Sequence, residues 1–172
     1  MAGKNSKSNG RNRIGPKERG RIQSLRNALK NYKFEKRDAC AENPFVDKIR
    51  SSLIQKAAFK DLKRRNIGPV AEILGKKYIP DLVLPGRGNL LAVEFKILKG
   101  NATSDDISFK EGIAQAVINR IKYKYVMLVL VDISKEGKHR GVDKRSSPNY
   151  TRLYNKLKGE NIEIVPMGPT KR

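Results

Sequence analysis

The chain has 172 residues, which suits one compact domain with tails and allows a sizeable buried core. Its 38 Lys and Arg residues outnumber 17 acidic residues, and the formal net charge of +21 favours a polyanionic partner such as nucleic acid. The single cysteine, Cys40, excludes an internal disulfide framework and a cysteine-based zinc site. The longest apolar run, Val126 to Val131, is too short to span a bilayer, so we expect a soluble, cytoplasmic protein that does not bind membranes.

The N-terminal part of the chain is predicted to be a basic arm followed by two helices. Residues 1–20 carry too little apolar surface to fold alone, which predicts a disordered arm. Apolar residues at helical spacing predict a short helix over 21–32. A longer helix is predicted over 44–65, because Asn43 suits the N-cap, Pro44 suits the first helical position and an apolar stripe follows.

Three short strands are predicted next, over 70–74, 79–84 and 90–97. The segment Pro85–Asn89, with two glycines, is a strong turn signal between the second and third strands. Short turns between consecutive strands favour antiparallel neighbours, so this part of the chain predicts a three-stranded β-meander.

The remaining chain is predicted to alternate between helix and strand. The pattern predicts a helix over 107–122, a strand over 125–133, a charged loop over 134–147, a helix over 148–158 and a strand over 162–165. A helix between two apolar strands implies a right-handed crossover and parallel pairing. We therefore predict one α/β domain over 21–166, with a mixed β-sheet flanked by helices, and a short tail over 167–172.

The helix over 107–122 is predicted to turn one apolar side towards the sheet. The residues on that side are Ile107, Ala114, Val117, Ile118 and Ile121.

The sharpest chemical signal combines Asp81, which follows Pro80, with Glu94 and Lys96, and twelve residues separate Asp81 from Glu94. Side chains alternate along a strand, so Glu94 and Lys96 point to one face and Phe95 points to the other. A turn that folds the Asp81 strand back brings Asp81 beside Glu94. Two carboxylates suit a hard cation such as Mg²⁺, and a nearby lysine suits water activation and charge stabilisation. The alternative is a surface ion pair between Glu94 and Lys96 on an edge strand.

These residues resemble the PD-(D/E)XK nuclease superfamily, with Pro80-Asp81 and Glu94-Phe95-Lys96 as the matching motif. The resemblance implies a restriction endonuclease-like or Holliday junction resolvase-like core, made of a three-stranded meander, a crossover helix and a further strand. It also implies that Asp81 and Glu94 bind Mg²⁺, that the carbonyl of Phe95 assists and that Lys96 is catalytic.

Many members of this superfamily carry a further acid on the helix before the meander. The candidates here are Glu42, Asp47 and Asp61, and Glu72 on the first predicted strand is another. Glu42 and Asp47 have an equally good alternative role, because acids near a helix N-terminus favour the helix dipole.

The helix after the motif carries Lys110 and Gln115, which resemble a lysine and a site-facing glutamine in several branches of the superfamily. Gln115 is therefore a candidate catalytic residue, and the alternative is a solvent-facing polar pair. Asn119 and Tyr123 follow at i+4 and i+8 from Gln115 and can extend the same polar face.

Phosphate contacts are predicted for basic residues outside the motif. They are Lys110, Lys138, Arg140, Lys144 and Arg145. The sequence thus predicts a Mg²⁺-dependent endonuclease of DNA, with Mn²⁺ as a possible substitute, of the junction resolvase, phage or restriction, or repair type. A homodimer and a partner protein that supplies specificity are further expectations. The alternatives are a non-catalytic nucleic-acid-binding protein on the same fold and a basic RNA- or ribosome-associated protein.

Overall fold

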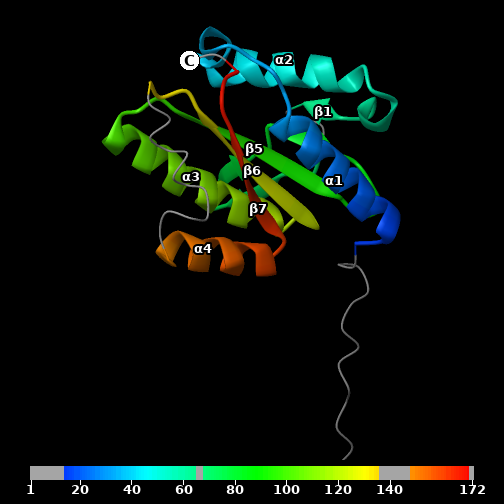
Figure 1. Cartoon of the computed structure of the whole chain (residues 1–172). Helices are drawn as coiled ribbons and strands as arrows, with labels where there is room; N and C mark the ends of the chain where they lie inside the picture. The colour runs from blue at the N-terminus through cyan, green and yellow to red at the C-terminus, as the bar shows by residue number, and fades with distance from the viewer. Residues whose placement is uncertain (1–13, 65–67, 136–147, 171–172) are drawn as a thin grey trace, which may run out of the picture.

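The computed structural model describes residues 14–64, 68–135 and 148–170. The fold is α/β, with a five-stranded mixed sheet of order β1-β4-β5-β6-β7 and a separate two-stranded hairpin, β2-β3 (Figure 1). The elements in chain order are α1 Pro16–Lys30, the 3-10 helix Lys36–Ala39, α2 Glu42–Ile54, the 3-10 helix Ala57–Phe59, β1 Lys63–Arg64, β2 Ala71–Ile73, β3 Lys76–Tyr78, β4 Leu82–Leu84, β5 Leu91–Leu98, α3 Ala102–Arg120, β6 Tyr125–Asp132, α4 Pro148–Gly159 and β7 Ile162–Met167.

The sheet is antiparallel at one side and parallel at the other. Strand β4 pairs with β1 and β5 in antiparallel fashion, whereas β5–β6 and β6–β7 are parallel. Parallel neighbours need crossover connections, and α3 lies in the connection between β5 and β6 while α4 lies between β6 and β7. The predicted parallel pairing of the apolar strand after the crossover helix is therefore confirmed.

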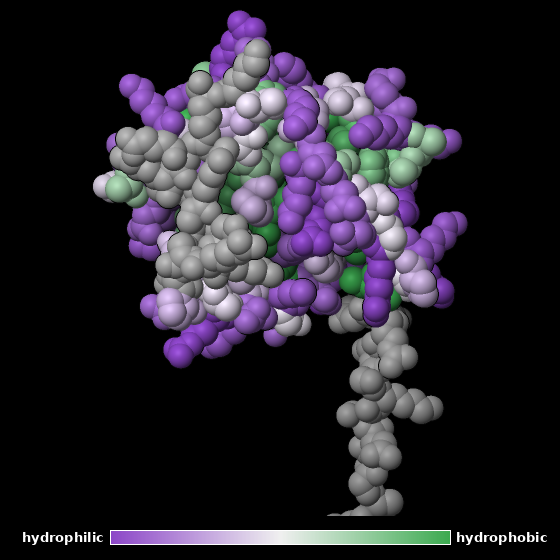
Figure 2. Space-filling view, in the orientation of Figure 1, coloured by the Kyte–Doolittle hydropathy of each residue, from purple (hydrophilic) through white to green (hydrophobic). Residues whose placement is uncertain are grey.

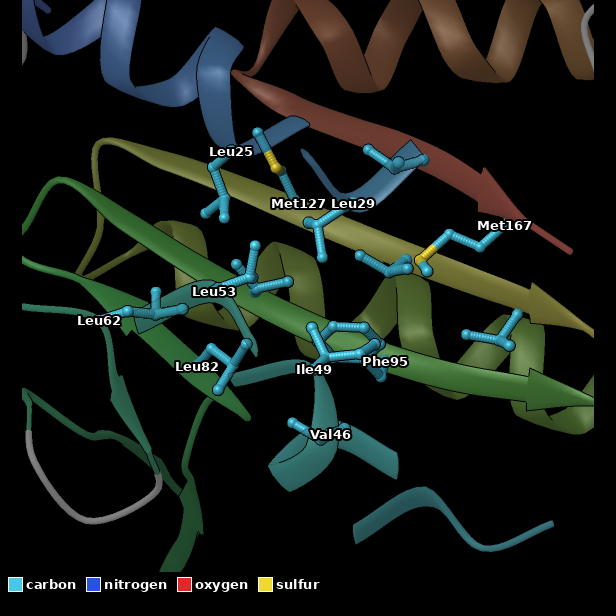
Figure 3. Close-up of a cluster of buried hydrophobic side chains, with 14 of the residues drawn as sticks. Leu25, Leu29, Val46, Ile49, Leu53, Leu62, Leu82, Phe95, Met127 and Met167 are labelled. Carbon is cyan, nitrogen blue, oxygen red and sulfur yellow. The ribbon is translucent and has the colours of Figure 1, made fainter. Parts of the chain in front are cut away.

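Helices cover both faces of the sheet. Buried residues of α1 and α2 form one core cluster with one face of the sheet, and α4 and the inner side of α3 form a second cluster with the other face. Figure 3 shows part of the first cluster. It includes Leu25 and Leu29 from α1, Val46, Ile49 and Leu53 from α2, and Leu82, Phe95, Met127 and Met167 from the sheet.

The alternation along β5 decides which side chains face each helical layer. Val93, Phe95 and Ile97 belong to the cluster with α1 and α2. The flanking residues Ala92 and Leu98 belong to the opposite cluster, so Glu94 and Lys96, which alternate with them, point to the α3 side.

The ends of the domain differ from the prediction. Helix α1 begins at Pro16, within the predicted arm, because proline suits the first helical position and Glu18 accepts a hydrogen bond from the Gly15 N–H at 3.0 Å. Residues 1–13 of that arm lie outside the described residues. At the other end, Met167 is buried in β7 and Thr170 N–H donates to Phe34 O at 2.9 Å, so the predicted tail packs on the domain.

The prediction of one helix over 44–65 is wrong. Helix α2 ends at Ile54, and the chain reverses through a 3-10 turn that buries Phe59 and Leu62. Arg50 Nε donates to Leu62 O at 3.1 Å and fixes the returning chain against α2. Burial of two large apolar side chains thus outweighs helical propensity in this segment.

The predicted meander is wrong in its first strand. Strand β2 lies within the first predicted strand, but it pairs with β3, which forms over 76–78, where a turn was predicted at 75–77. Leu74 and Gly75, both with positive φ, make the tight turn of this β2–β3 hairpin. The place beside β4 is taken by β1, with Lys63 opposite Val83 and Arg64 opposite Leu82. Strand β2 pairs with β3 in a separate two-stranded sheet, so it is not the first strand of a meander with β4 and β5.

The predicted apolar side of α3 is not the side that packs on the sheet. Ile107, Val117 and Ile121 are 52%, 49% and 66% exposed. The buried positions include Gly112 and Ala116, whose small side chains let the helix approach β5 and β6 closely. Asn119 is buried on the same side.

The outer surface of the described residues is mainly polar. On the face drawn in Figure 2, hydrophilic side chains cover most of the described area, and hydrophobic groups show mainly in the depressions between them. Among the described helices, none has the length and apolar character needed to cross a membrane.

Candidate active site

Two buried carboxylates lie next to each other where β4 begins. The β4–β5 register pairs Leu82 with Val93, so the preceding residue, Asp81, comes opposite Glu94. Asp81 is 1% exposed and Glu94 is 4% exposed. Burial of two acids side by side is unfavourable unless other groups or a cation compensate their charge.

The Asp81 side chain is held by β5 and by a strand-edge arginine. Phe95 N–H donates to Asp81 Oδ2 at 2.8 Å. Arg64 Nη1 lies 3.6 Å from Asp81 Oδ1 and donates to the Asp81 carbonyl at 3.2 Å. The same guanidinium reaches α2, where its Nε lies 2.6 Å from Asp47 Oδ1 and its Nη2 donates to Asn43.

Glu94 lies between strand and helix, and α3 supplies its hydrogen-bond donor. The amide Nδ2 of the fully buried Asn119 donates to Glu94 Oε1. Burial, and next the charge of Asp81, raise the pKa of Glu94 well above its ordinary value, while Lys96 and Asn119 act in the opposite direction. Because a cation would favour the charged form of Glu94, this carboxylate is suited to holding a metal ion.

Lys96 lies on the same face as Glu94, and its ammonium reaches an acid at the start of α2. Lys96 Nζ is 3.8 Å from Glu42 Oε2, and Glu42 is the first residue of α2. Of the helix acids considered from the sequence, Glu42 is therefore the one placed beside the motif lysine.

The other three acids lie elsewhere. Asp47 is an exposed partner of Arg64, as described above. Asp61 forms an ion pair with Arg21 at 2.7 Å, and Glu72 is exposed in the β2–β3 hairpin opposite Lys77. None of these three has a described contact with Asp81 or Glu94 carboxylate oxygens.

Helix α3 passes so close to Lys96 that only glycine fits at one position. A Cβ added at Gly112 would lie 2.9 Å from Lys96 Cγ and 2.9 Å from Leu128 Cδ1. Gly112 thus lets the helix confine the aliphatic part of the lysine.

We expect Gly112→Ala to lower the free energy of unfolding by about 1–3 kcal/mol, because the helix or Lys96 must shift. The matched control is Gly20→Ala in α1, where nothing lies within 4 Å of an added Cβ. That change is expected to raise stability by about 0.5–1 kcal/mol through helix propensity. Urea denaturation of both variants checks the pair, and equal effects at both sites would contradict the close approach.

Gln115 and Lys110 have different places on α3. Gln115 is half-buried, one turn before Asn119, and its Oε1 is buried with no hydrogen-bond partner among the described residues. Lys110 is exposed and pairs with Asp106 at 2.6 Å. The position of Gln115 on the Asn119 side of α3 is compatible with a supporting role, whereas the Lys110 side chain points to solvent.

Tyr123 follows the C-terminal end of α3 and contacts the base of the β2–β3 hairpin. Its hydroxyl donates to Pro69 O at 3.0 Å. Burial, with a smaller contribution from the charge of Glu94, raises the pKa of Tyr123 to about 12, so the hydroxyl remains a donor at neutral pH.

Of two residues that contact the carboxylates, the sequence indicated Asn119 but not Arg64. The i+4 spacing from Gln115 already placed Asn119 on the polar side of α3, and Asn119 is the donor to Glu94. Arg64 was missed, because in a continuous helix its charge is explained by the helix dipole. The predicted phosphate contacts Lys138, Arg140, Lys144 and Arg145 lie outside the described residues.

The edge-strand alternative for Glu94 and Lys96 is wrong, because β5 lies between β4 and β6.

Continued β4–β5 pairing would set Phe95 opposite Pro80, which has no N–H to donate. The N–H and C=O of one strand residue point to the same side, so the Phe95 carbonyl faces the side on which Asp81 accepts the Phe95 N–H.

The carboxylate oxygens of Asp81 and Glu94, together with the Phe95 carbonyl, fit a magnesium ion. Mg²⁺ typically takes one or two carboxylates and keeps several waters. No cluster of three or more His, Cys, Asp or Glu side chains placed to hold a metal occurs within residues 14–64, 68–135 and 148–170. A metal here would therefore rest on Asp81, Glu94 and backbone or water oxygens.

Comparison of the chain with family models, with curated proteins and with solved structures gave no match.

Proposed function

We propose that the protein is a Mg²⁺-dependent endonuclease that hydrolyses DNA phosphodiester bonds, with a PD-(D/E)XK type of active site on a restriction endonuclease-like core. The observation that carries the proposal is the adjacency of two buried carboxylates, Asp81 and Glu94, on the strand face shared by Lys96. The net charge of +21 supports a nucleic acid as the substrate.

The side chains of the site have distinct tasks in this proposal. Asp81 and Glu94 hold the metal, with the Phe95 carbonyl as a further ligand. Mg²⁺ held by these residues would acidify water and neutralise charge that develops on the phosphate. Lys96 orients the attacking water and stabilises negative charge in the transition state.

Several polar residues support these groups. Asn119 fixes the Glu94 carboxylate, and Arg64 ties Asp81 to α2. Glu42 pairs with Lys96 and lies where a third acid would act. Gln115 completes the polar side of α3 and is proposed to orient water or phosphate at the site.

The predicted phosphate contacts are proposed to hold the DNA backbone; they are Lys110, Lys138, Arg140, Lys144 and Arg145. Lys110 lies on the exposed side of α3. The homodimer and the specificity-giving partner protein also remain proposals. The exposed Ile107 and Val117 on α3 support a contact with another protein surface.

The test is cleavage of supercoiled plasmid and of branched DNA in Mg²⁺, Mn²⁺ and EDTA. Wild-type protein is expected to cut with either metal and not in EDTA. Asp81→Ala and Lys96→Ala are expected to slow cleavage by about 1000-fold or more, while their affinity for DNA stays within about threefold of wild type. If wild-type protein binds DNA and never cuts it, and both variants bind equally well, the protein is a binding module instead.

A further inference from the structure

The tip of the β2–β3 hairpin carries an apolar residue in an unfavourable position. Ile73 pairs with Lys76, so Leu74 and Gly75 alone form the turn, with φ values of 51° and 74°. A turn of this kind is ordinarily made by Asn-Gly or Asp-Gly. The Leu74 side chain is fully exposed.

Leucine therefore gains nothing at this position from folding. A left-handed backbone is unfavourable for a bulky L-residue. Full exposure means that no burial offsets this cost. An apolar side chain that is both strained and solvent-exposed is expected where the residue contacts something other than its own chain.

The charges beside the tip favour a nucleic acid as that contact. Lys76 and Lys77 follow the turn and point to opposite faces of the hairpin. The half-exposed Ile73 lies opposite Lys76 and enlarges the apolar tip on that face. On the other face Lys77 lies opposite Glu72, so the apolar tip adjoins a cation with no acid opposite it on the Lys76 face. An apolar end beside such a cation matches stacked bases next to a phosphate backbone.

The hairpin is joined firmly to the candidate active site. Its base is held to the end of α3 by the hydrogen bond from Tyr123 to Pro69, and a Cβ at Gly68 would lie 2.6 Å from the Tyr123 hydroxyl oxygen. Asp81 follows Leu74 by seven positions, which an extended chain spans in at most about 25 Å. At about 3.4 Å per nucleotide, that reach corresponds to about seven base steps.

We propose that Leu74 is a wedge that inserts between bases of DNA within about seven steps of the cleaved bond. This inference rests on the proposed nuclease function. Separating stacked bases costs free energy, and the cost is lowest where stacking is already interrupted. The substrate class is therefore DNA with a branch, bulge or mismatch rather than regular duplex.

The test uses the full-length protein in EDTA, where the wedge acts without cleavage. The probes are a four-way junction with 2-aminopurine at the branch and a linear duplex that carries the same label. Leu74→Asn removes the apolar tip and supplies a residue that suits the turn, so the fold is kept. Ile121→Asn removes another exposed apolar side chain, at the C-cap of α3 and away from the hairpin tip, and is the matched control.

Wild-type protein is expected to raise 2-aminopurine fluorescence at the branch about threefold or more, and Ile121→Asn to do the same. Leu74→Asn is expected to lose most of this increase and about tenfold of its preference for junction over duplex. Its affinity for the linear duplex is expected to stay within about twofold, since the lysines remain.

The proposal is overturned if wild-type protein leaves the branch fluorescence unchanged, or if Leu74→Asn matches wild type in fluorescence and preference. It is also overturned if Leu74→Asn acts by altering the sedimentation coefficient, which would assign the tip to contact with a second copy. Failure of the nuclease proposal is seen separately, as a wild-type protein that opens the branch in EDTA and cuts nothing in Mg²⁺.

Discussion

Glu94→Gln is expected to slow Mg²⁺-dependent cleavage by about 1000-fold or more and to stabilise the metal-free protein. The glutamine keeps the shape of the side chain but removes one of two negative charges in a buried site. Loss of a metal ligand removes the neutralisation of charge on the phosphate. Loss of a buried charge that lies beside a second carboxylate is expected to raise the melting temperature by about 2–6 °C.

The pH dependence of this stabilisation follows from the raised pKa of Glu94, which burial and the Asp81 charge cause. Folding favours the protonated form, so the stability associated with that form is present at low pH and lost as pH rises through the raised value. The gap in melting temperature between Glu94→Gln and wild type is therefore expected to close near the ordinary glutamate pKa of 4.5 and to widen towards neutral pH.

The measurement is thermal unfolding of both proteins between about pH 4 and pH 8 in EDTA, repeated with Mg²⁺ at neutral pH. Mg²⁺ is expected to stabilise wild type and to leave Glu94→Gln nearly unchanged, because only wild type binds it well. The exposed Glu111→Gln of α3 is the control and is expected to alter neither cleavage nor melting. A Glu94→Gln protein that melts below wild type at neutral pH would show that the carboxylate stabilises the fold.

Phe95→Ala is expected to have the opposite effect on stability, although it changes the neighbouring residue. Phe95 is fully buried, and its ring points into the core formed with α1 and α2 (Figure 3). Because side chains alternate along β5, Glu94 and Lys96 lie on the opposite face. Removal of a buried phenylalanine leaves a cavity and costs about 3–5 kcal/mol. For a domain of this size such a loss removes much of the total stability.

Urea denaturation monitored by circular dichroism measures this effect. Phe95→Leu, which fills most of the same space, is the matched control and is expected to cost less than about 1.5 kcal/mol. A cost below about 1 kcal/mol for Phe95→Ala would contradict the assignment of Phe95 to the core.

The central strand and the faces of its side chains were predictable from the sequence. The alternation in Val93–Ile97 requires two charges on one side of an otherwise apolar strand, and the structure places them beneath α3. The apolar run after the next helix similarly predicted a buried parallel strand, which is β6. In both cases the decisive information lies within one short segment.

The elements that were predicted wrongly depend on contacts between distant segments. The helical pattern continues past Ile54, and only the burial of Phe59 and Leu62 against α2 and the sheet reverses the chain. This reversal delivers Arg64 to Asp81, 17 residues away. No local pattern contains that contact, so the arginine was explained as a helix-end charge.

The side of α3 that faces the sheet was predicted wrongly for a different reason. The predicted apolar residues of this helix, Ile107, Val117 and Ile121, are exposed. The buried residues on its sheet-facing side include Gly112, Ala116 and Asn119, and Phe109 and Ile113 pack partly buried against the same core. Hydrophobic periodicity finds the most apolar side of a helix, whereas the closest packing here requires the smallest residues. The structure of α3 is therefore explained by proximity to Lys96 and Leu128 more than by hydrophobicity.

The alternation on β5 also has a consequence for how the sheet finds its pairing during folding. A slip of one residue relative to β4 and β6 would turn Glu94 and Lys96 into the apolar layer beneath α1 and α2 and expose Phe95 to the polar side of α3. Two unpaired charges in an apolar layer would make such a misaligned state far less stable than the native one. Glu94 and Lys96, which are proposed for catalysis, therefore also favour the native register of the sheet during folding. In a variant that neutralises both residues, the native and the slipped register are expected to differ less in stability.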